Sequence, residues 1–554
     1  MKRITILSLV MMASLAGMGQ WSSNPEKNLF IAGYQRSNMP GYWGEKVQTN
    51  AYGDTYLLYR SSTLSPSILL VDRKGHAVWE PRAALLGWDR ADGSRTGLVC
   101  DPEGNAITGL EIGRWTTDKH YQRYIKIQKI NTRGEPLWGI GGIDFSHPDY
   151  DLVGSSMTLC NDGSILLVYQ PWEDTTNQYP PSVTVRQVHR ILPDGTLAWG
   201  PDGLTFREKA WSELYPLKDG TFFRLWYVQE SKNPNQLYSV WINYYDRSGR
   251  RVWAKDLKIF DRQIGNDMAL AGVLNNTLYI SWFPYSIQAI NQEGNELYAA
   301  GGEPVFGTRF GAFSSIKSIG KDPEGNLIFC VVFQTNSLLV HRCHKMSHSG
   351  ELLWGPEGKE LLPVRYTGAP VHYRLDSTGN LFVFYRDPAP GGVWPEVNSR
   401  FWMDGFDTDG NKLAGFPVLI ASQKRLRSPG NVTEVKNGQM IFLWEEKVPD
   451  VNLTFFAAQN VNIDGTLGNR STGIGEAGPV SENSYIGYDF NSRVLVLQPS
   501  NEPRKIRLIS LTGSKVLELV TSGNPIVPLN LRGLFILEIE GSSIPPERHK
   551  ILVF

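Results

Sequence analysis

Two short turn phrases alternate along most of this 554-residue chain, and they constrain its fold more than any other feature. The first phrase is a β-type run, a turn ending in glycine and then a tryptophan, as in INTRGEPLW (130–138) and ILPDGTLAW (191–199). With weaker copies it occurs eight times, about 56 residues apart. Its glycines are Gly75, Gly134, Gly195, Gly249, Gly294, Gly350, Gly410 and Gly465. Repeats of this length are typical of arrays whose units pack against their neighbours.

The second phrase is a turn followed by an apolar β-type run, as in CNDGSILLVY (160–169). It also occurs eight times, with turn centres at Gly53, Gly104, Gly163, Gly220, Asn275-Asn276, Gly325, Gly379 and Gly438. Asparagine can replace glycine because it also enters the left-handed backbone region. Each unit therefore has two tight hairpins, which make a four-stranded meander.

These meanders, without helical periodicity between them, predict an all-β fold. We expect an eight-bladed β-propeller over residues 47–474, or a seven-bladed one if the last unit forms no blade. Within the N-terminal segment 20–46, residues 28–36 are expected to give a closing strand to the last unit. The recurrent tryptophans are expected to start each outermost strand and to pack between units. They are Trp79, Trp138, Trp199, Trp253 and Trp354.

Residues 1–19 have the layout of a cleaved signal peptide. Met1-Lys2-Arg3 is basic, the stretch from Ile4 to Gly17 is apolar, and small residues precede Gln20. The apolar run is shorter than the roughly 20 residues that span a membrane. Lys and Arg (55) balance Asp and Glu (55), so there is no basic surplus for nucleic acid. We expect an exported chain that binds no nucleic acid and has no transmembrane segment when mature.

The blade phrases stop after residue 474, and residues 475–491 are interpreted as a linker. Residues 492–554 hold five short β-type runs separated by turns, which predicts a small Ig-like β-sandwich. This segment resembles the type A sorting domain of the Bacteroidetes type IX secretion system. The resemblance lies in IRLISLTGSKVLEL with Gly513, LNLRGLFILEIE with Gly533, and HKILVF with Lys550. It implies passage through the periplasm to the cell surface or medium, with the type IX machinery as partner.

The propeller repeats resemble those of large secreted bacterial surface proteins. They are also similar to quinone-dehydrogenase repeats, but the adjacent Cys-Cys pair of that family is absent. Sialidase-type Asp boxes have Trp three residues after Gly, whereas Trp138 follows Gly134 by four. We therefore predict no cofactor.

Four cysteines are too few for a disulfide scaffold. If Asn336-Ser337 is a two-residue hairpin loop, Cys330 and Cys343 lie directly opposite each other. The sequence leaves open a disulfide between them or two buried free thiols.

Neither a metal site nor a catalytic motif is readable. His341, His344 and His348 lie on a strand and its turn, which would not bring three ligands together. Long loops between the second and third strands carry aromatic residues instead. Trp115, Tyr121, Trp172, Tyr179 and Trp394 could line a shallow binding site, or could pack neighbouring loops together.

We therefore expect a surface-exposed or secreted binding or adhesion protein that presents a glycan or protein ligand site on its loops. The alternative is a secreted glycan-active enzyme, a glycosidase or lyase on a propeller scaffold. The sequence names neither the ligand nor an oligomeric state, and it does not say whether the C-terminal domain is cleaved.

Overall fold

The all-β prediction is confirmed by the computed structural model of the chain. It describes residues 21–26, 28–35, 46–60, 66–79, 84–85, 97–115, 121–147, 149–172, 184–208, 212–229, 237–263, 270–282, 286–299, 301–304, 313–335, 338–362, 371–386, 398–427, 430–447, 453–468, 485–489, 494–497, 503–510, 514–521, 526–528, 533–541 and 547–553. Every regular element in these ranges is a β-strand. None of the described residues belongs to a helix long and apolar enough to cross a membrane.

Units 1 to 6 are separate four-stranded antiparallel sheets, each made of consecutive strands. Their strands are β2 (Lys46–Thr49), β3 (Thr55–Arg60), β4 (Pro66–Val71), β5 (Ala84–Leu85); β6 (Leu98–Cys100), β7 (Ala106–Trp115), β8 (Tyr121–Ile130), β9 (Ile143–Phe145); β10 (Asp151–Leu159), β11 (Ile165–Trp172), β12 (Thr184–Ile191), β13 (Leu204–Glu208); β14 (Ser212–Pro216), β15 (Phe222–Gln229), β16 (Leu237–Tyr245), β17 (Leu257–Gln263); β18 (Leu270–Leu274), β19 (Thr277–Trp282), β20 (Ser286–Ile290), β21 (Glu303–Pro304); β22 (Phe313–Lys321), β23 (Leu327–Thr335), β24 (Leu338–Met346) and β25 (Lys359–Glu360).

The last two units share one larger sheet. Unit 7 is β26 (His372–Leu375), β27 (Leu381–Arg386), β28 (Asn398–Phe406) and β29 (Val418–Arg427), and unit 8 is β30 (Asn431–Val432), β31 (Gln439–Lys447), β32 (Leu453–Asn462) and β1 (Leu29–Gln35). They merge because β29 pairs with β31 at Arg427 and Glu446. The eight-blade count stays a prediction, because the sheet pairing does not separate these two units.

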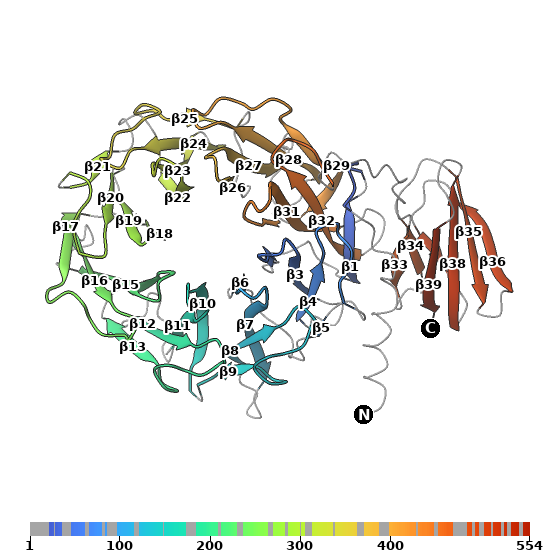
Figure 1. Ribbon diagram of the computed structural model, residues 1–554, viewed down its shortest axis with the longest axis horizontal. Helices are drawn as coiled ribbons and strands as arrows, with labels where there is room; N and C mark the ends of the chain where they lie inside the picture. The colour runs from blue at the N-terminus through green and yellow to red at the C-terminus, as the bar shows by residue number, and fades with distance from the viewer. Residues whose placement is uncertain are drawn as a thin grey trace.

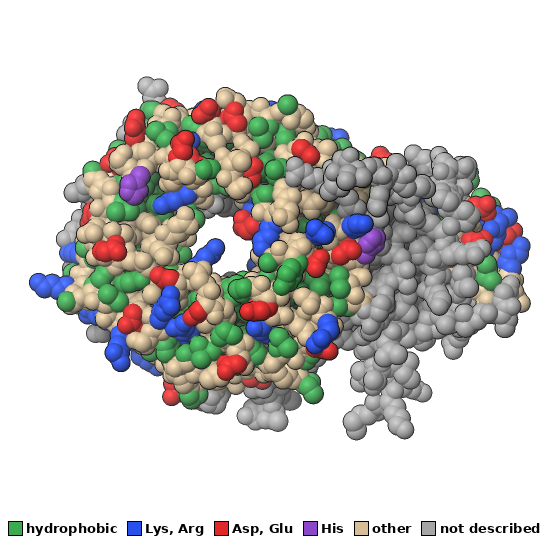
Figure 2. Space-filling model, viewed as in Figure 1, with side chains coloured by type: hydrophobic (Ala, Val, Ile, Leu, Met, Phe, Trp, Pro, Cys, Tyr) green, Lys and Arg blue, Asp and Glu red, His purple; other side chains and the backbone are tan. Residues whose placement is uncertain are grey.

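The units form a ring around a central opening (Figure 1). First strands such as β6, β10 and β18 lie nearest the opening, and fourth strands such as β9, β13 and β17 lie outside. Figure 2 shows that side chains leave this opening unfilled and that charged groups lie at its rim. Because consecutive strands are antiparallel, both tight turns of each unit lie on one face, here called the glycine-turn face. The segments joining second to third strands and one unit to the next lie on the opposite, loop face.

The turn glycines take the backbone conformation that the phrases require. Gly195, for example, has φ +92°, and Asn275 and Asn276 have φ +48° and +61°. A Cβ on Gly195 would also lie 2.9 Å from the Trp138 ring. Trp79, Trp138 and Trp253 each pack in this way on the glycine turn of the next unit, whereas Leu204 lies against Gly249 and Lys359 against Gly410. Trp79 and Trp138 each also donate their indole N–H to a carbonyl in that turn, Thr132 (2.7 Å) and Pro193 (3.1 Å) respectively.

The expectation that these tryptophans start the outermost strands is wrong. Trp138 follows a single bridge, and strand β9 begins only at Ile143. The backbone leaves the extended region between them, because Gly139 has φ +79° and Gly142 has φ +71°. The repeated Trp-Gly pair therefore makes a turn before the outermost strand.

The N-terminal segment closes the ring. Strand β1 pairs antiparallel with β32, so it is the outermost strand of unit 8. Trp21 is 3% exposed and packs against the turn glycine of unit 1, Gly75. The eighth Gly phrase, NIDGTLG, has no tryptophan of its own, and Trp21 takes that position.

The C-terminal segment forms two further sheets. One contains β33 (Tyr485–Asp489), β34 (Val494–Leu497) and β37 (Ile526–Pro528), and the other β36 (Lys515–Thr521), β35 (Arg504–Ser510), β38 (Gly533–Gly541) and β39 (Glu547–Val553). Strand β33 lies inside the predicted linker, so that boundary is corrected. Its pattern is hidden by Gly487, where the pairing with β34 shifts register. Gly533 starts β38, and Lys550 lies on the edge strand β39 opposite Ile536, whereas Gly513 lies outside the described residues.

Candidate functional site

Charged groups on the glycine-turn face are bound to one another. Lys129 on β8 lies 2.8 Å from Asp101, and Lys345 on β24 lies 2.8 Å from Asp322, with all four side chains buried. Burial alone would raise the pKa of Asp322, but hydrogen bonds from Lys345 and Asn326 lower it below its usual value. These ion pairs hold the turns together. Their charged atoms are already paired with each other, so they offer few hydrogen-bonding groups to a ligand.

A second set of buried polar residues was not predicted from the sequence. Ten residues before the tryptophan position, the third strand carries a buried polar side chain, and in units 2 and 5 this side chain holds the following turn. Gln128 donates to Gly139 O (2.7 Å), and Gln288 donates to Ala299 O (3.2 Å). His189 and His344 occupy the same position, and burial lowers the pKa of each to about 4. The constant spacing to Trp was the available signal, but Gln, His and Asn alternate there.

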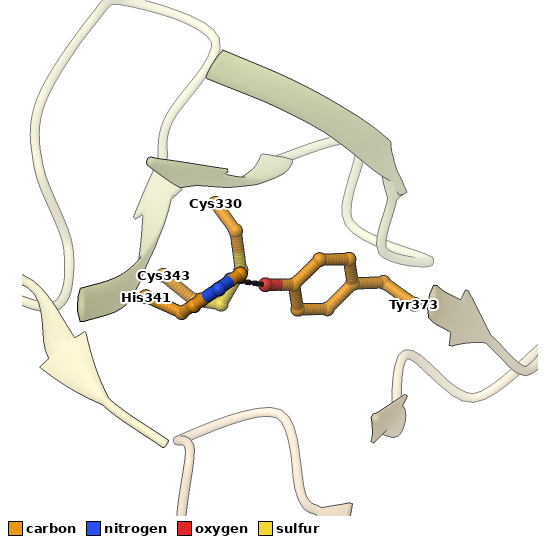
Figure 3. The surroundings of a disulfide bond; sticks show 4 residues. All are labelled: Cys330, His341, Cys343 and Tyr373. Carbon is orange, nitrogen blue, oxygen red and sulfur yellow. Dashed lines mark hydrogen bonds between the residues drawn. A yellow bond between two sulfur atoms is a disulfide. The ribbon is translucent and has the colours of Figure 1, made fainter. Parts of the chain in front are cut away.

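Cys330 and Cys343 lie opposite each other on β23 and β24, at the register expected for the Asn336-Ser337 loop, and their sulfurs form a disulfide. Both are buried. Beside them, His341 Nδ1 lies 2.6 Å from the Tyr373 hydroxyl of β26, which joins units 6 and 7 (Figure 3). His344 instead stacks on Phe329, so the two histidines have different partners. Within the described part of the chain, no group of three His, Cys, Asp or Glu could hold a metal ion.

Three of the five predicted aromatic site residues are described. Trp115 and Tyr121 are directly paired at the end of β7 and the start of β8, on the loop face. Trp172 is the last residue of β11, also on the loop face, and it is half-buried. Tyr179 and Trp394 lie outside the described residues.

One contact brings these strand ends of units 2 and 3 together. The backbone N–H of Arg123, two residues after Tyr121, donates to Asp151 Oδ1 at 2.9 Å. Asp151 is in turn the strand partner of Trp172. Below this contact, the buried Glu111 accepts both the backbone N–H (2.8 Å) and the hydroxyl (2.9 Å) of Ser155. Units 2 and 3 are therefore fixed relative to each other where the aromatic residues lie.

The connection between the two units adds further polar and aromatic groups. His147 stacks on Tyr150 with ring centroids 4.2 Å apart and planes 19° apart. The His147 carbonyl accepts a hydrogen bond from Gln122, and Asp149 is exposed. We call this set the unit 2–3 edge: Arg123, His147, Asp149, Tyr150, Asp151 and Trp172, together with the backbone positions of Trp115 and Tyr121 at the paired ends of β7 and β8. Aromatic rings, carboxylates and an imidazole together can contact both the apolar faces and the hydroxyl groups of a ligand.

No family model and no curated protein matches this chain. Among solved structures, the polysaccharide lyase Uly1 is similar at 10% identity and a TM-score of 0.38, covering 82% of this chain and 99% of that chain. A protein of unknown function from Dyadobacter fermentans is similar at 12% identity and a TM-score of 0.35, covering 80% and 98%. The α-L-arabinofuranosidase Arb93A from Fusarium graminearum is similar at 9% identity and a TM-score of 0.30, covering 80% and 99%. At these sequence identities and TM-scores, the similarity concerns the all-β fold alone, and the activities of those proteins are not assigned to this chain.

Proposed function

We propose that the protein is an exported, glycan-directed protein whose unit 2–3 edge contacts the carbohydrate. The single observation that carries this is the contact of Arg123 with Asp151, which brings the strand ends bearing Tyr121 and Trp172 to one edge. Rings such as Trp and Tyr combine an apolar face with a polar tip, which suits a ligand that has both CH and OH surfaces.

The charged side chains at this edge indicate whether a neutral or an anionic polysaccharide would bind there. Asp149 and Asp151 offer carboxylate acceptors, and Arg123 is an exposed cation. Carboxylates accept hydrogen bonds from hydroxyl groups, whereas they repel an anionic polymer. A neutral polysaccharide is therefore the ligand that we propose.

The second candidate is a glycan-active enzyme at the same edge. It is favoured by the half-buried His147 beside the exposed Asp149, whose backbone N–H donates to His147 Nδ1 at 3.2 Å. Imidazole and carboxylate are the usual groups for proton transfer at a glycosidic bond. In this case the protein would cleave the polysaccharide that it binds.

The test is a polysaccharide binding array followed by titration of the purified protein with the best ligand. We expect saturable binding of a neutral polysaccharide that falls on Trp172→Ala. Reducing-end or unsaturated-product assays on the same polysaccharide distinguish the two candidates, since only an enzyme releases new ends. Absence of binding and of turnover across neutral polysaccharides would contradict both.

For export, we propose that residues 1–19 direct the chain to the periplasm and that residues 492–554 are the type IX sorting domain. The placement of β39 at a sheet edge supports a clean test. Deleting residues 549–554 shortens that edge strand and leaves part of β38 unpaired. We expect the truncated protein to stay in the periplasm with a folded propeller. Normal levels of truncated protein on the cell surface or in the medium would contradict the proposal.

A further inference from the structure

Strand β10, the first strand of unit 3, contains a β-bulge close to the unit 2–3 edge. Its pairing with β11 shifts register between Val153 and Ser156, so that Gly154 and Ser155 together lie opposite Tyr169. Gly154 has φ +64°, the left-handed conformation that a glycine takes in one common type of bulge. The first strand therefore has one residue more than its partner at this point.

The bulge decides which residue of β10 lies opposite Trp172. In the observed register, Asp151 is the direct partner of Trp172. If the pairing of Ser156 with Val168 continued without the extra residue, Leu152 would take that place. A slip of one residue moves the side chains of a strand to the opposite faces. The bulge therefore places a carboxylate, and not an apolar side chain, opposite Trp172.

A carboxylate of the neighbouring unit holds this bulge. Glu111 of β7 is buried, and its Oε1 accepts both the backbone N–H (2.8 Å) and the hydroxyl (2.9 Å) of Ser155, which is also buried. A bulge disrupts the ladder hydrogen bonds around its extra residue, and a buried N–H is costly without an acceptor. Glu111 supplies an acceptor from unit 2.

Unit 2 thus holds β10 at two points, Ser155 and Asp151. The second point is the backbone N–H of Arg123, which donates to Asp151 Oδ1 at 2.9 Å in an exposed position. Glu111 and Arg123 lie on the paired strands β7 and β8. A buried hydrogen bond to a charged group contributes more than one that competes with water, so the contact of Glu111 is the stronger of the two.

We propose that Glu111 is a positioning residue for the carbohydrate site. By holding the bulge at Ser155 it keeps Asp151 opposite Trp172, where both can contact the ligand. This inference rests on the proposed function, because it assigns the ligand contacts to the unit 2–3 edge. Glu111 itself is buried below that edge and acts through the position of Asp151.

The test titrates the wild type and two Glu111 variants with neutral polysaccharides, namely xyloglucan, galactomannan, mixed-linkage β-glucan and arabinan. Glu111→Leu removes the acceptor and should weaken binding roughly tenfold or more, because Asp151 loses its fixed position. Glu111→Gln keeps Oε1, which alone accepts both hydrogen bonds, and should bind within about threefold of the wild type. Rescue by Gln separates the hydrogen bonds from the charge.

Gln128→Leu is the matched control for a loss of stability alone. Gln128 is also a buried polar residue of unit 2, but its side chain donates to Gly139 O in the turn before β9. Its Tm should fall while its affinity stays that of the wild type. If Glu111→Leu does not fold, Ser155→Ala replaces it in every comparison. Ser155→Ala removes only the hydroxyl hydrogen bond and should weaken binding about threefold.

A double variant tests the route from Glu111 to the ligand. If Glu111 acts through Asp151, the variant Glu111→Leu, Asp151→Ala should bind no more weakly than Asp151→Ala alone. Hydrogen–deuterium exchange of residues 149–158 gives a readout that needs no ligand. Glu111→Leu should speed exchange there, and Glu111→Gln should not.

Three results would overturn the positioning role while the proposed function stands. They are equal affinity of Glu111→Leu and the wild type, additive losses in the double variant, and unchanged exchange of residues 149–158 in Glu111→Leu. A wild type that binds none of the four polysaccharides contradicts the proposed function itself, and the positioning role falls with it.

Discussion

The two faces of the ring use similar residue types for different purposes. On the glycine-turn face, Asp and Lys side chains pair with each other below the surface, as Asp322 does with Lys345. On the loop face, the unit 2–3 edge leaves Asp149 exposed and Trp172 half-buried at a strand end. A residue's chemistry alone therefore does not assign its role. The burial of a side chain and the partners that the fold supplies decide which of these groups hold the turns together.

The largest expected effect comes from breaking a buried pair on the glycine-turn face. Lys345→Met leaves the Asp322 carboxylate buried without its cation, which should lower the free energy of unfolding by about 3–5 kcal/mol. Arg133→Gln is the matched control, because its pair with Glu135 is exposed to solvent and should contribute little to stability. Chemical denaturation measures both. Equal losses in the two variants would show that burial does not set the value of these pairs.

The disulfide should have the next largest effect. The double variant Cys330→Ala, Cys343→Ala opens a loop of 13 residues and should cost about 3 kcal/mol. Cys160→Ala, at a buried free thiol, is the control and should not change the response of stability to reductant. Intact-mass analysis of the alkylated, unreduced protein checks the bond directly. Alkylation of all four cysteines without reduction would contradict it.

Adding one methyl group at a turn glycine should lower the free energy of unfolding by a smaller amount. Gly195→Ala places a Cβ in a left-handed conformation and 2.9 Å from Trp138, and we expect a loss of about 1–2 kcal/mol. Gly272→Ala is the control, since its Cβ would meet no atom within 4 Å. Thermal unfolding of both compares the positions. A neutral Gly195→Ala would mean that the Trp-on-Gly contact is not tight.

The smallest change in stability at neutral pH is expected when His189 and His344 are replaced. Burial lowers the pKa of each from 6.5 to about 4, so between these values the unfolded chain binds more protons than the folded one. Stability should therefore fall as pH drops from 6.5 towards 4. Replacing both by Gln, which units 2 and 5 carry at this position, should flatten that slope. Denaturant titrations from pH 4 to 8 test this, and an unchanged slope would place the acid sensitivity elsewhere.

Much of the fold could be predicted because the conformation of its turns is set by residues that are adjacent in sequence. A positive φ selects Gly or Asn, so Gly195 and Asn275-Asn276 mark turns without knowledge of the tertiary structure. The register of Cys330 and Cys343 follows from a two-residue loop between them.

Two kinds of feature could not be predicted. One depends on contacts between residues distant in sequence, and the other on positions that several residue types can occupy. The closing strand at residues 28–36 was expected, but the place of Trp21 was not: no repeat phrase points to it, and the contact beside it, where Gln459 donates to Ser22 O, spans 437 residues. The buried polar position alternates between Gln128, which donates to Gly139 O, and His189, whose Nε2 lies 2.9 Å from the Tyr169 hydroxyl, so no single residue type marks it. At the unit 2–3 edge, the aromatic residues could be picked from loop length, but His147 and Asp151 were found only through their contacts.

The most direct test of the account compares one aromatic residue from each face in a glycan-binding titration. Trp172→Ala removes a ring at the unit 2–3 edge, and Tyr52→Ala removes a 59% exposed ring on the glycine-turn face. We predict that Trp172→Ala weakens binding of the best neutral polysaccharide roughly tenfold or more, with the Tm nearly unchanged, and that Tyr52→Ala binds like the wild type. Equal affinity of Trp172→Ala and the wild type, or loss of binding in Tyr52→Ala alone, would contradict the assignment of the site to the loop face.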